Sequence, residues 1–316
     1  MTAVFLTIDT EFRWRHHVAG RSWRDNYARS IEPGGVGLTY QLGLLAAHRL
    51  KACFFVDPMP ALTYGLEPIR RVVEAVLAAG QEVQLHLHPN WAGARPGDGG
   101  RAAVRHELND CGYAEQLALI AGAAALLQAA GAPRPVAFRA GSYAADDATL
   151  AALAELGFTY DSSHNGAHQP WPSKVGLPAR RISPVRREVV EVPVTVVEDA
   201  PGRLRTAQIC ALSEAEMRAM LSHAAAERHA AVVVVSHSFE LANRDGARPN
   251  AVHVRRFEAL CRTLAERRDA LPTAHFGDRP ALALDRDDEP LGPDLLRTSW
   301  RRAEQLWSNW VAERAA

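Results

Sequence analysis

The chain has 316 residues, and its 36 basic side chains balance its 36 acidic ones, so it carries no formal net charge. A balanced charge gives no reason to expect a nucleic acid or an anionic membrane surface as a partner. The apolar runs are too short and too interrupted to cross a bilayer, so we expect no membrane insertion.

The first segment, MTAVFLTIDTEF, lacks the basic lead and the small-residue cleavage site of a signal peptide. Four cysteines lie far apart in no paired pattern, which is typical of reduced thiols, so we expect a cytoplasmic protein. They are Cys53, Cys111, Cys210 and Cys261.

AVFLTIDTEF predicts an apolar strand that ends with Asp9 and Glu11. Alternate residues of a strand share a face, so the two carboxylates lie together and repel each other unless a cation or an arginine lies between them. A solvated strand end is the alternative, but Val4 to Ile8 is too apolar for an exposed edge.

Residues 12–33 are rich in arginine and aromatic side chains and follow Glu11 directly. An irregular segment of this length is usually functional, and indole rings beside arginines suit sugar faces or anionic groups. We therefore expect Trp14 at the substrate, while a surface loop over the rim of a barrel remains an open alternative.

A helix over residues 34–50, a strand over 51–57 and a helix over 67–79 lead into GQEVQLHLHPNW, residues 80–91. Here His86 and His88 share one face of a predicted buried strand. Two imidazoles at this spacing can bind one divalent ion, for which zinc is well suited. Two histidines that are merely hydrogen-bonded in a core remain the alternative. Trp91 follows them and is assigned to substrate binding.

The next segments repeat the alternation of helix and strand. Residues 92–112 predict a long loop, and VVVVSHSF predicts a strand buried on both faces that ends with His237. Repeated β then α predicts a parallel barrel of about seven strands. The other expected helices are 113–130, 146–156, 213–228 and 250–269, and the other strands are 135–142, 158–163, 188–197 and 273–276.

Past Ala283 the composition shifts to DRDDEPLGPD, a charged linker, and a last helix is predicted from Leu295 to Arg314. We therefore divide the chain into a barrel domain, 1–284, and a linker with an amphipathic helix, 285–316. The helix carries Trp300, Ala303, Trp307, Trp310 and Val311 along one side. This side predicts a packing face or a homodimer face, and the sequence leaves both open.

Acids and histidines at the carboxyl ends of three predicted strands resemble the polysaccharide deacetylases, also called the NodB-homology or carbohydrate esterase 4 family. The resemblance covers five blocks in order, TIDTE, EVQLHLHP, FRAGSY, YDSS and VSHS. Within this family, the chain most resembles the intracellular branch, whose first block reads DxE. The resemblance implies an α/β fold, a distorted (β/α)7 barrel of the NodB-homology type with a C-terminal helical extension.

Roles follow from the resemblance residue by residue. Asp9 matches the catalytic base, Glu11 the metal carboxylate and His86 the first metal histidine. The second metal histidine of the family falls on Asn90. His88 is physically the better third ligand because it shares a face with His86 and imidazole binds better than an amide. Asn90 as the ligand, or a weakened metal site, stays open. Arg139 matches the arginine that pairs with the base, and the backbone of Tyr143 resembles the oxyanion donor at the substrate. His237 matches the catalytic histidine, and Asp161 matches the acid that tunes it.

The resemblance implies a hydrolase that uses a divalent metal, foremost Zn²⁺, to remove an N-acetyl or other small N-acyl group from an amino sugar or glycoconjugate. Asp9 would serve as base and His237 as general acid. Hydrolysis of another C–N bond, as in cyclic ureides and imides, is the first alternative. A binding protein without turnover is the second. The expected partner is a small-molecule or glycan substrate.

Overall fold

The computed structural model describes residues 1–95, 97 and 105–314, and its centre is an eight-stranded sheet in the order β10-β1-β2-β3-β4-β5-β7-β6. All neighbours in it are parallel except β6 and β7. The strands β8 and β9 form a separate antiparallel pair. The strand bounds are β1 Ala3–Thr10, β2 Cys53–Val56, β3 Glu82–Leu87, β4 Ala137–Ala140, β5 Tyr160–Asp161, β6 Val185–Arg186, β7 Val190–Glu191, β8 Val196–Ala200, β9 Arg203–Thr206 and β10 Ala231–His237.

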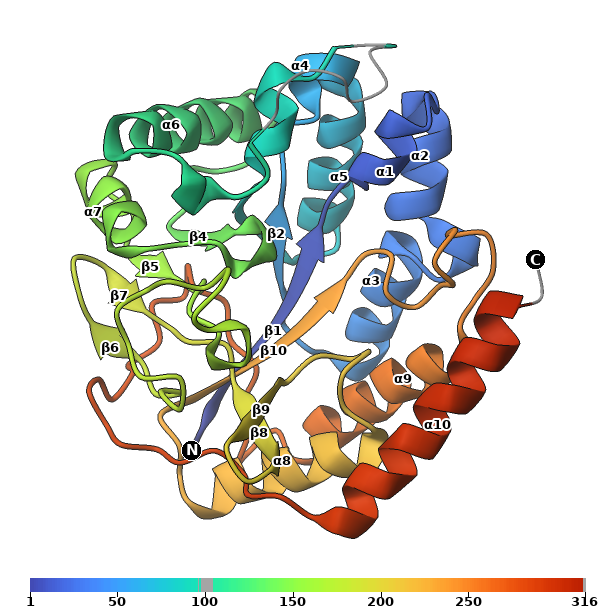
Figure 1. Cartoon of the computed structure of the whole chain (residues 1–316), viewed down its shortest axis with the longest axis vertical. Helices are drawn as coiled ribbons and strands as arrows, with labels where there is room; N and C mark the ends of the chain where they lie inside the picture. Colours follow the sequence, from blue (N-terminus) through green and yellow to red (C-terminus); the bar gives the residue numbers. More distant parts are fainter. Residues whose placement is uncertain (96, 98–104, 315–316) are drawn as a thin grey trace.

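Helices lie above, to the right of and below this sheet, β6 and β7 form its left edge, and β1 and β10 lie side by side near the middle of the molecule (Figure 1). The α/β fold class and the distorted barrel are thus confirmed. The helices are α1 Trp14–Val18, α2 Trp23–Ser30, α3 Leu38–His48, α4 Ala61–Tyr64, α5 Glu67–Ala78, α6 Tyr113–Ala129, α7 Asp147–Glu155, α8 Glu214–Ala226, α9 Ala251–Glu266 and α10 Leu295–Arg314, and the short 3-10 turns are η1 Pro33–Gly35, η2 Pro89–Gly93, η3 Leu108–Asp110, η4 Gly141–Tyr143 and η5 Gly166–His168.

Alternation along the strands gives the sheet two different apolar sides. Leu6 and Ile8 of β1 belong to a large cluster under the helices, whereas Phe5 belongs to a smaller cluster inside the barrel. There Phe5 stacks on Phe276 with ring centroids 4.3 Å apart. Because aligned residues of parallel neighbours present side chains to the same face, the alignment of Asp9 with His237 turns both toward the interior.

Three predicted segments differ from the structure. Residues 12–33 are largely helical, as α1 and α2. The predicted strand 188–197 is interrupted between β7 and β8, where Pro193 has no N–H to donate to a ladder. Residues 273–276 form an isolated bridge from Thr273 to Val4 and no strand. Part of the predicted loop 92–112 lies outside the described residues.

The helix α10 packs against its own chain through polar side chains. Arg301 donates to Glu216 at 3.0 Å and to Asp199 at 2.9 Å, and Asn250, which precedes α9, donates to Ser308 at 3.0 Å. Trp300, Trp307 and Trp310 point away and are 67%, 60% and 56% exposed. The polar side of α10 therefore packs in cis, and its tryptophan side faces outward. The division at residue 284 stays a prediction. In the part of the chain that the structure describes, every helix is too short or too polar for a membrane span.

Arg301→Ala tests this polar contact. Removal of the guanidinium leaves Asp199 and Glu216 with fewer donors, so we expect the free energy of unfolding to fall by about 2–3 kcal/mol. The neighbouring Arg302 is exposed on the same helix, and Arg302→Ala should change it by less than about 0.5 kcal/mol. Urea denaturation followed by circular dichroism measures both values, and equal losses in the two variants would contradict the assignment.

Candidate active site

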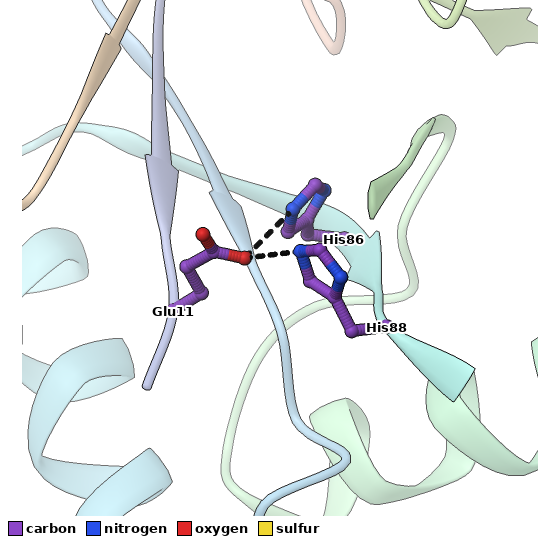
Figure 2. Close-up of side chains that lie close together, drawn as sticks. All are labelled: Glu11, His86 and His88. Carbon is purple, nitrogen blue, oxygen red and sulfur yellow. Dashed lines mark ion pairs between the residues drawn. The ribbon is translucent and has the colours of Figure 1, made fainter. Parts of the chain in front are cut away.

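A carboxylate and two imidazoles meet where β1 and β3 end (Figure 2). The Oε2 atom of Glu11 lies 3.3 Å from Nε2 of His86 and makes a closer ion pair with Nε2 of His88. Among the described residues this is the one group of three potential metal ligands, with all ligand atoms within 4.8 Å of one another. The three side chains predicted to bind a divalent ion therefore do converge in the structure.

A backbone carbonyl group orients the ring of His86. Its Nδ1 lies 2.8 Å from the carbonyl oxygen of Arg139, and because a carbonyl can only accept, Nδ1 carries the proton. In the neutral ring, Nε2 then presents its lone pair toward Glu11. A backbone carbonyl in this role is the usual partner of a metal-binding histidine.

The ring of His88 lies against Gly141, which follows β4. A Cβ at position 141 would overlap Nδ1 and the neighbouring ring atoms of His88. Glycine is therefore required there by close approach.

The electrostatics of the group suit a bound cation. Although burial opposes ionisation, the charges of His88 and His86 lower the pKa of Glu11 well below its ordinary value. Burial favours neutral His88, yet the Glu11 carboxylate raises the pKa of that imidazole to about 9. Oε2 of Glu11 and Oδ2 of nearby Asp57 are both buried without a well-aligned hydrogen-bond donor. Two imidazoles and a carboxylate with unsatisfied oxygen atoms fit a zinc-type ion.

Asp9 lies inside the barrel, paired with a fully buried arginine. Nη1 of Arg139 donates to Oδ1 of Asp9 at 2.8 Å and to the hydroxyl of Thr7 at 2.8 Å. The remaining guanidinium nitrogens donate to Ser162, and the plane lies 4.5 Å from the ring centroid of Phe55. The ion pair fixes the orientation of the Asp9 carboxylate.

His237, at the end of β10, faces the same cavity. Its Nε2 lies 3.9 Å from Oδ2 of Asp9, and its Nδ1 lies 3.5 Å from Oε2 of Glu240. Burial favours the neutral ring, but the hydrogen bond and the charge of Glu240, with a smaller effect of Asp9, raise the pKa of His237 to about 9. In turn, and against the effect of burial, His237 lowers the pKa of Glu240 to about 2. The imidazole is thus a cation at neutral pH, held by Glu240.

The expected pairing of Asp161 with His237 requires correction. Asp161 aligns with Phe138, which lies in the cluster under the helices, so its side chain points away from the barrel interior that His237 faces. Its carboxylate accepts from Ser163 at 2.7 Å and contacts Glu191. Burial, together with the neighbouring Asp161, raises the pKa of Glu191 well above its ordinary value, because two adjacent buried carboxyl groups do not both ionise.

Two consecutive residues after Gly141 adopt left-handed backbone conformations, Ser142 with φ 55° and Tyr143 with φ 61°. Within the part of the chain that the structure describes, neither N–H donates to a backbone carbonyl. Strained backbone of this kind is often found at functional sites. Both residues line a cavity of about 150 Å³ together with Asp9, Glu11, His86, His88 and His237.

A second, outer cavity of about 330 Å³ shares Glu11, His88 and Ser142 with the inner one. Trp14 and Trp91, both expected at the substrate, line it, and their rings meet edge to face with centroids 5.0 Å apart. Trp91 is only 1% exposed, so it mainly supports the wall. Asn90 also lines this outer cavity, whereas His88 reaches Glu11.

Two acids of the site were missed from the sequence. Asp57 follows β2 as Glu11 follows β1, so the rule that strand ends carry the chemistry could have found it. Glu240 lies three residues after His237, in the turn beyond β10, where strand alternation gives no information.

Neither a protein-family model nor a curated protein matches this sequence. Solved structures do match. A Mycobacterium smegmatis protein named as a polysaccharide deacetylase superposes with a TM-score of 0.54 at 19% identity, over 91% of this chain and 94% of that one. A Pseudomonas aeruginosa PAO1 protein of the same description gives 0.53 at 15% identity, over 88% and 89%. The chain has the polysaccharide deacetylase fold.

The Puue allantoinase matches equally well, with a TM-score of 0.54 at 12% identity over 88% of each chain. At these identities the likeness shows a shared fold. The assignment to the DxE branch stays a prediction.

Gly141→Ala tests the support of His88. The added methyl group must displace the His88 ring, so we expect zinc affinity to fall by roughly 10- to 100-fold, as for loss of an orienting neighbour. Gly122→Ala in α6 is the matched control, because a Cβ there meets no atom within 4 Å. Isothermal titration with zinc measures both variants, and an unchanged affinity for Gly141→Ala would contradict the contact.

Proposed function

We propose that the protein is a metal-dependent amide hydrolase that removes an N-acetyl or other small N-acyl group from an amino sugar or glycoconjugate. The observation that carries this proposal is the joint presence, around one small cavity, of a ligand group, an arginine-paired carboxylate and a cationic histidine. The fold shared with proteins named as polysaccharide deacetylases supports it.

Glu11, His86 and His88 would hold the divalent ion, with zinc as the first choice. When bound, such an ion polarises a carbonyl and makes water more acidic. His88 is preferred over Asn90 because its Nε2 reaches the Glu11 carboxylate.

Asp9 is proposed to accept the proton of the attacking water. Its orientation comes from Arg139, which forms an ion pair with its Oδ1 atom. The second carboxylate oxygen, Oδ2, faces the cavity side, toward His237. Base and acid are therefore 3.9 Å apart at their nearest measured atoms, close enough to act on the same substrate carbon.

His237 is proposed to protonate the departing amine. An amine leaves poorly unless it gains a proton, so the acid must be cationic at the working pH. Glu240 meets this need by stabilising the imidazolium from the Nδ1 side, which leaves the Nε2 proton directed toward the cavity. The backbone N–H groups of Ser142 and Tyr143, two residues that line the inner cavity, are proposed to donate to a developing oxyanion.

The two cavities suggest which part of a substrate each would bind. The inner volume of about 150 Å³ suits a small acyl group, and the outer one offers the ring of Trp14 to a sugar. Hydrolysis of a cyclic ureide or imide is the second candidate, because the allantoinase shares the fold as closely as the named deacetylases. A binding protein without turnover would not need both Asp9 and His237 at the same cavity.

The direct test is acetate release from N-acetylated chitooligosaccharides by zinc-loaded protein, with allantoin and hydantoins assayed in parallel. We expect acetate from the glycan, and Asp9→Asn should lower the rate by roughly 100-fold or more while zinc stays bound. Turnover of cyclic ureides alone would favour the second candidate. Inactivity of zinc-loaded protein toward all of these amides would contradict a hydrolase.

The choice between His88 and Asn90 predicts two different metal affinities. His88→Ala removes a ligand, and we expect it to weaken zinc binding by more than the roughly 10- to 100-fold that loss of an orienting neighbour costs. Asn90→Ala should retain about one equivalent of zinc per chain. Metal analysis after dialysis against trace zinc distinguishes the two, and the reverse order of affinities would assign the third ligand to Asn90.

The pH dependence tests the role of Glu240. With the pKa of His237 raised to about 9, the rate should hold through neutral pH and fall as the imidazolium deprotonates above about 9. Glu240→Gln removes the stabilising charge, so the alkaline limb of kcat/KM should move to lower pH. Asp161→Asn is the control, since Asp161 faces the other side of the sheet and should leave that limb in place. A limb that moves with Asp161 and not with Glu240 would restore the original assignment.

A further inference from the structure

The outward side of α10 carries an apolar stripe that residues 1–95, 97 and 105–314 leave uncovered. Leu296 and Leu306 are 85% and 72% exposed, and three tryptophans beside them are more than half exposed. Figure 1 shows α10 along the outer edge of the molecule, next to α9. Because Arg301 and Ser308 hold the opposite side of the helix, the direction of this stripe is fixed.

The spacing of the stripe is that of a helix seam. Its members alternate steps of four and three residues, which is the a/d pattern by which one helix packs on another. Over these fifteen residues the seam therefore stays on one side of the helix. The seam consists of Leu296, Trp300, Ala303, Trp307 and Trp310.

The exposed area is sufficient for a stable pair. A tryptophan side chain offers about 150–250 Å², so the three indoles at their measured exposures leave roughly 300–450 Å² uncovered. With Leu296 the seam reaches roughly 500 Å², or roughly 1,000 Å² for two copies. This is about the area that a specific interface requires, and it lies near the upper end of the apolar patches found on monomers.

The seam is also complementary to itself. Ala303 leaves a notch at its centre, flanked by Trp300 and Trp307 one turn away on either side. In an antiparallel pair each Ala303 can lie opposite an indole of the second copy, so that large and small side chains alternate across the interface. Hollows of about 420 Å³ beside Trp300 and about 200 Å³ beside Trp307 lie along the same edge of the helix.

We propose that this protein forms a homodimer in which the α10 helices of two copies pack antiparallel along the seam. A membrane surface suits the stripe less well, because the flanking hollows carry the charged residues Glu214, Arg218 and Arg255. The small side chain of Ala303 also gives little apolar area for contact with lipid. The dimer does not depend on the proposed hydrolase activity.

Sedimentation velocity of the full chain tests the proposal over a concentration series. We expect a species of about 69 kDa, twice the chain mass of 34.5 kDa, at micromolar concentration. Ala303→Arg places a charge in the seam and should weaken the dimer by about 100-fold or more. Asn309→Arg adds the same side chain at an exposed position outside the seam, and it should leave the dimer intact.

Circular dichroism and zinc content of each variant show that the fold is retained. Co-sedimentation with phosphatidylcholine and with phosphatidylserine vesicles provides the competing outcome. A monomeric wild-type chain, an Ala303→Arg protein that dimerises as well as wild type, or a monomer that binds vesicles would each overturn the proposal.

Discussion

Arg139 joins the parts of the candidate site that would otherwise be independent. Its guanidinium binds Asp9, and its backbone carbonyl accepts the proton of His86. A fully buried guanidinium is costly unless its donors are used, and here Thr7, Asp9 and Ser162 accept four hydrogen bonds from it. The same residue therefore sets the orientation of the proposed base and the tautomer of a proposed ligand. Displacement of β4 would disturb both.

A second set of contacts connects the proposed acid to the outer helices. Glu240 holds His237 and accepts the N–H of Cys210, while its backbone carbonyl lies 2.8 Å from Nδ1 of His253 in α9. Arg256 of the same helix donates to the carbonyl of Cys210 and to Glu304 in α10. Continuous polar contacts thus run from the proposed acid to the helix that carries the exposed seam. They explain how α10 can bury charged residues and still be held firmly.

Much of this arrangement could be predicted from the sequence, and the failures have physical causes. Apolar runs identified β1 and β10, and the common edge formed by parallel strand ends brought Asp9 and His237 together. The role of Asp161 was carried over from the family resemblance, and it failed because the side chain lies on the other face of the sheet; β5 has only two residues, too few for alternation to have revealed this. Glu240 was missed because it lies in a turn.

The orientation of α10 also could not be predicted from local sequence patterns. Its tryptophan stripe was recognised, but amphipathic patterning usually predicts that the apolar side packs inward. Here the buried partners Asp199 and Glu216 select the arginine side instead, and such partners are distant in sequence. Long-range charge pairing, which no local pattern reveals, decides the orientation.

The central claim is that Glu11, His86 and His88 bind one divalent ion. Anomalous diffraction at the zinc edge, from crystals grown with zinc, tests it most directly. The account predicts a single strong peak at about 2.0–2.2 Å from a carboxylate oxygen of Glu11 and from Nε2 of both histidines. A peak bound by Asn90 in place of His88, or zinc-soaked crystals with no peak at these side chains, would contradict it.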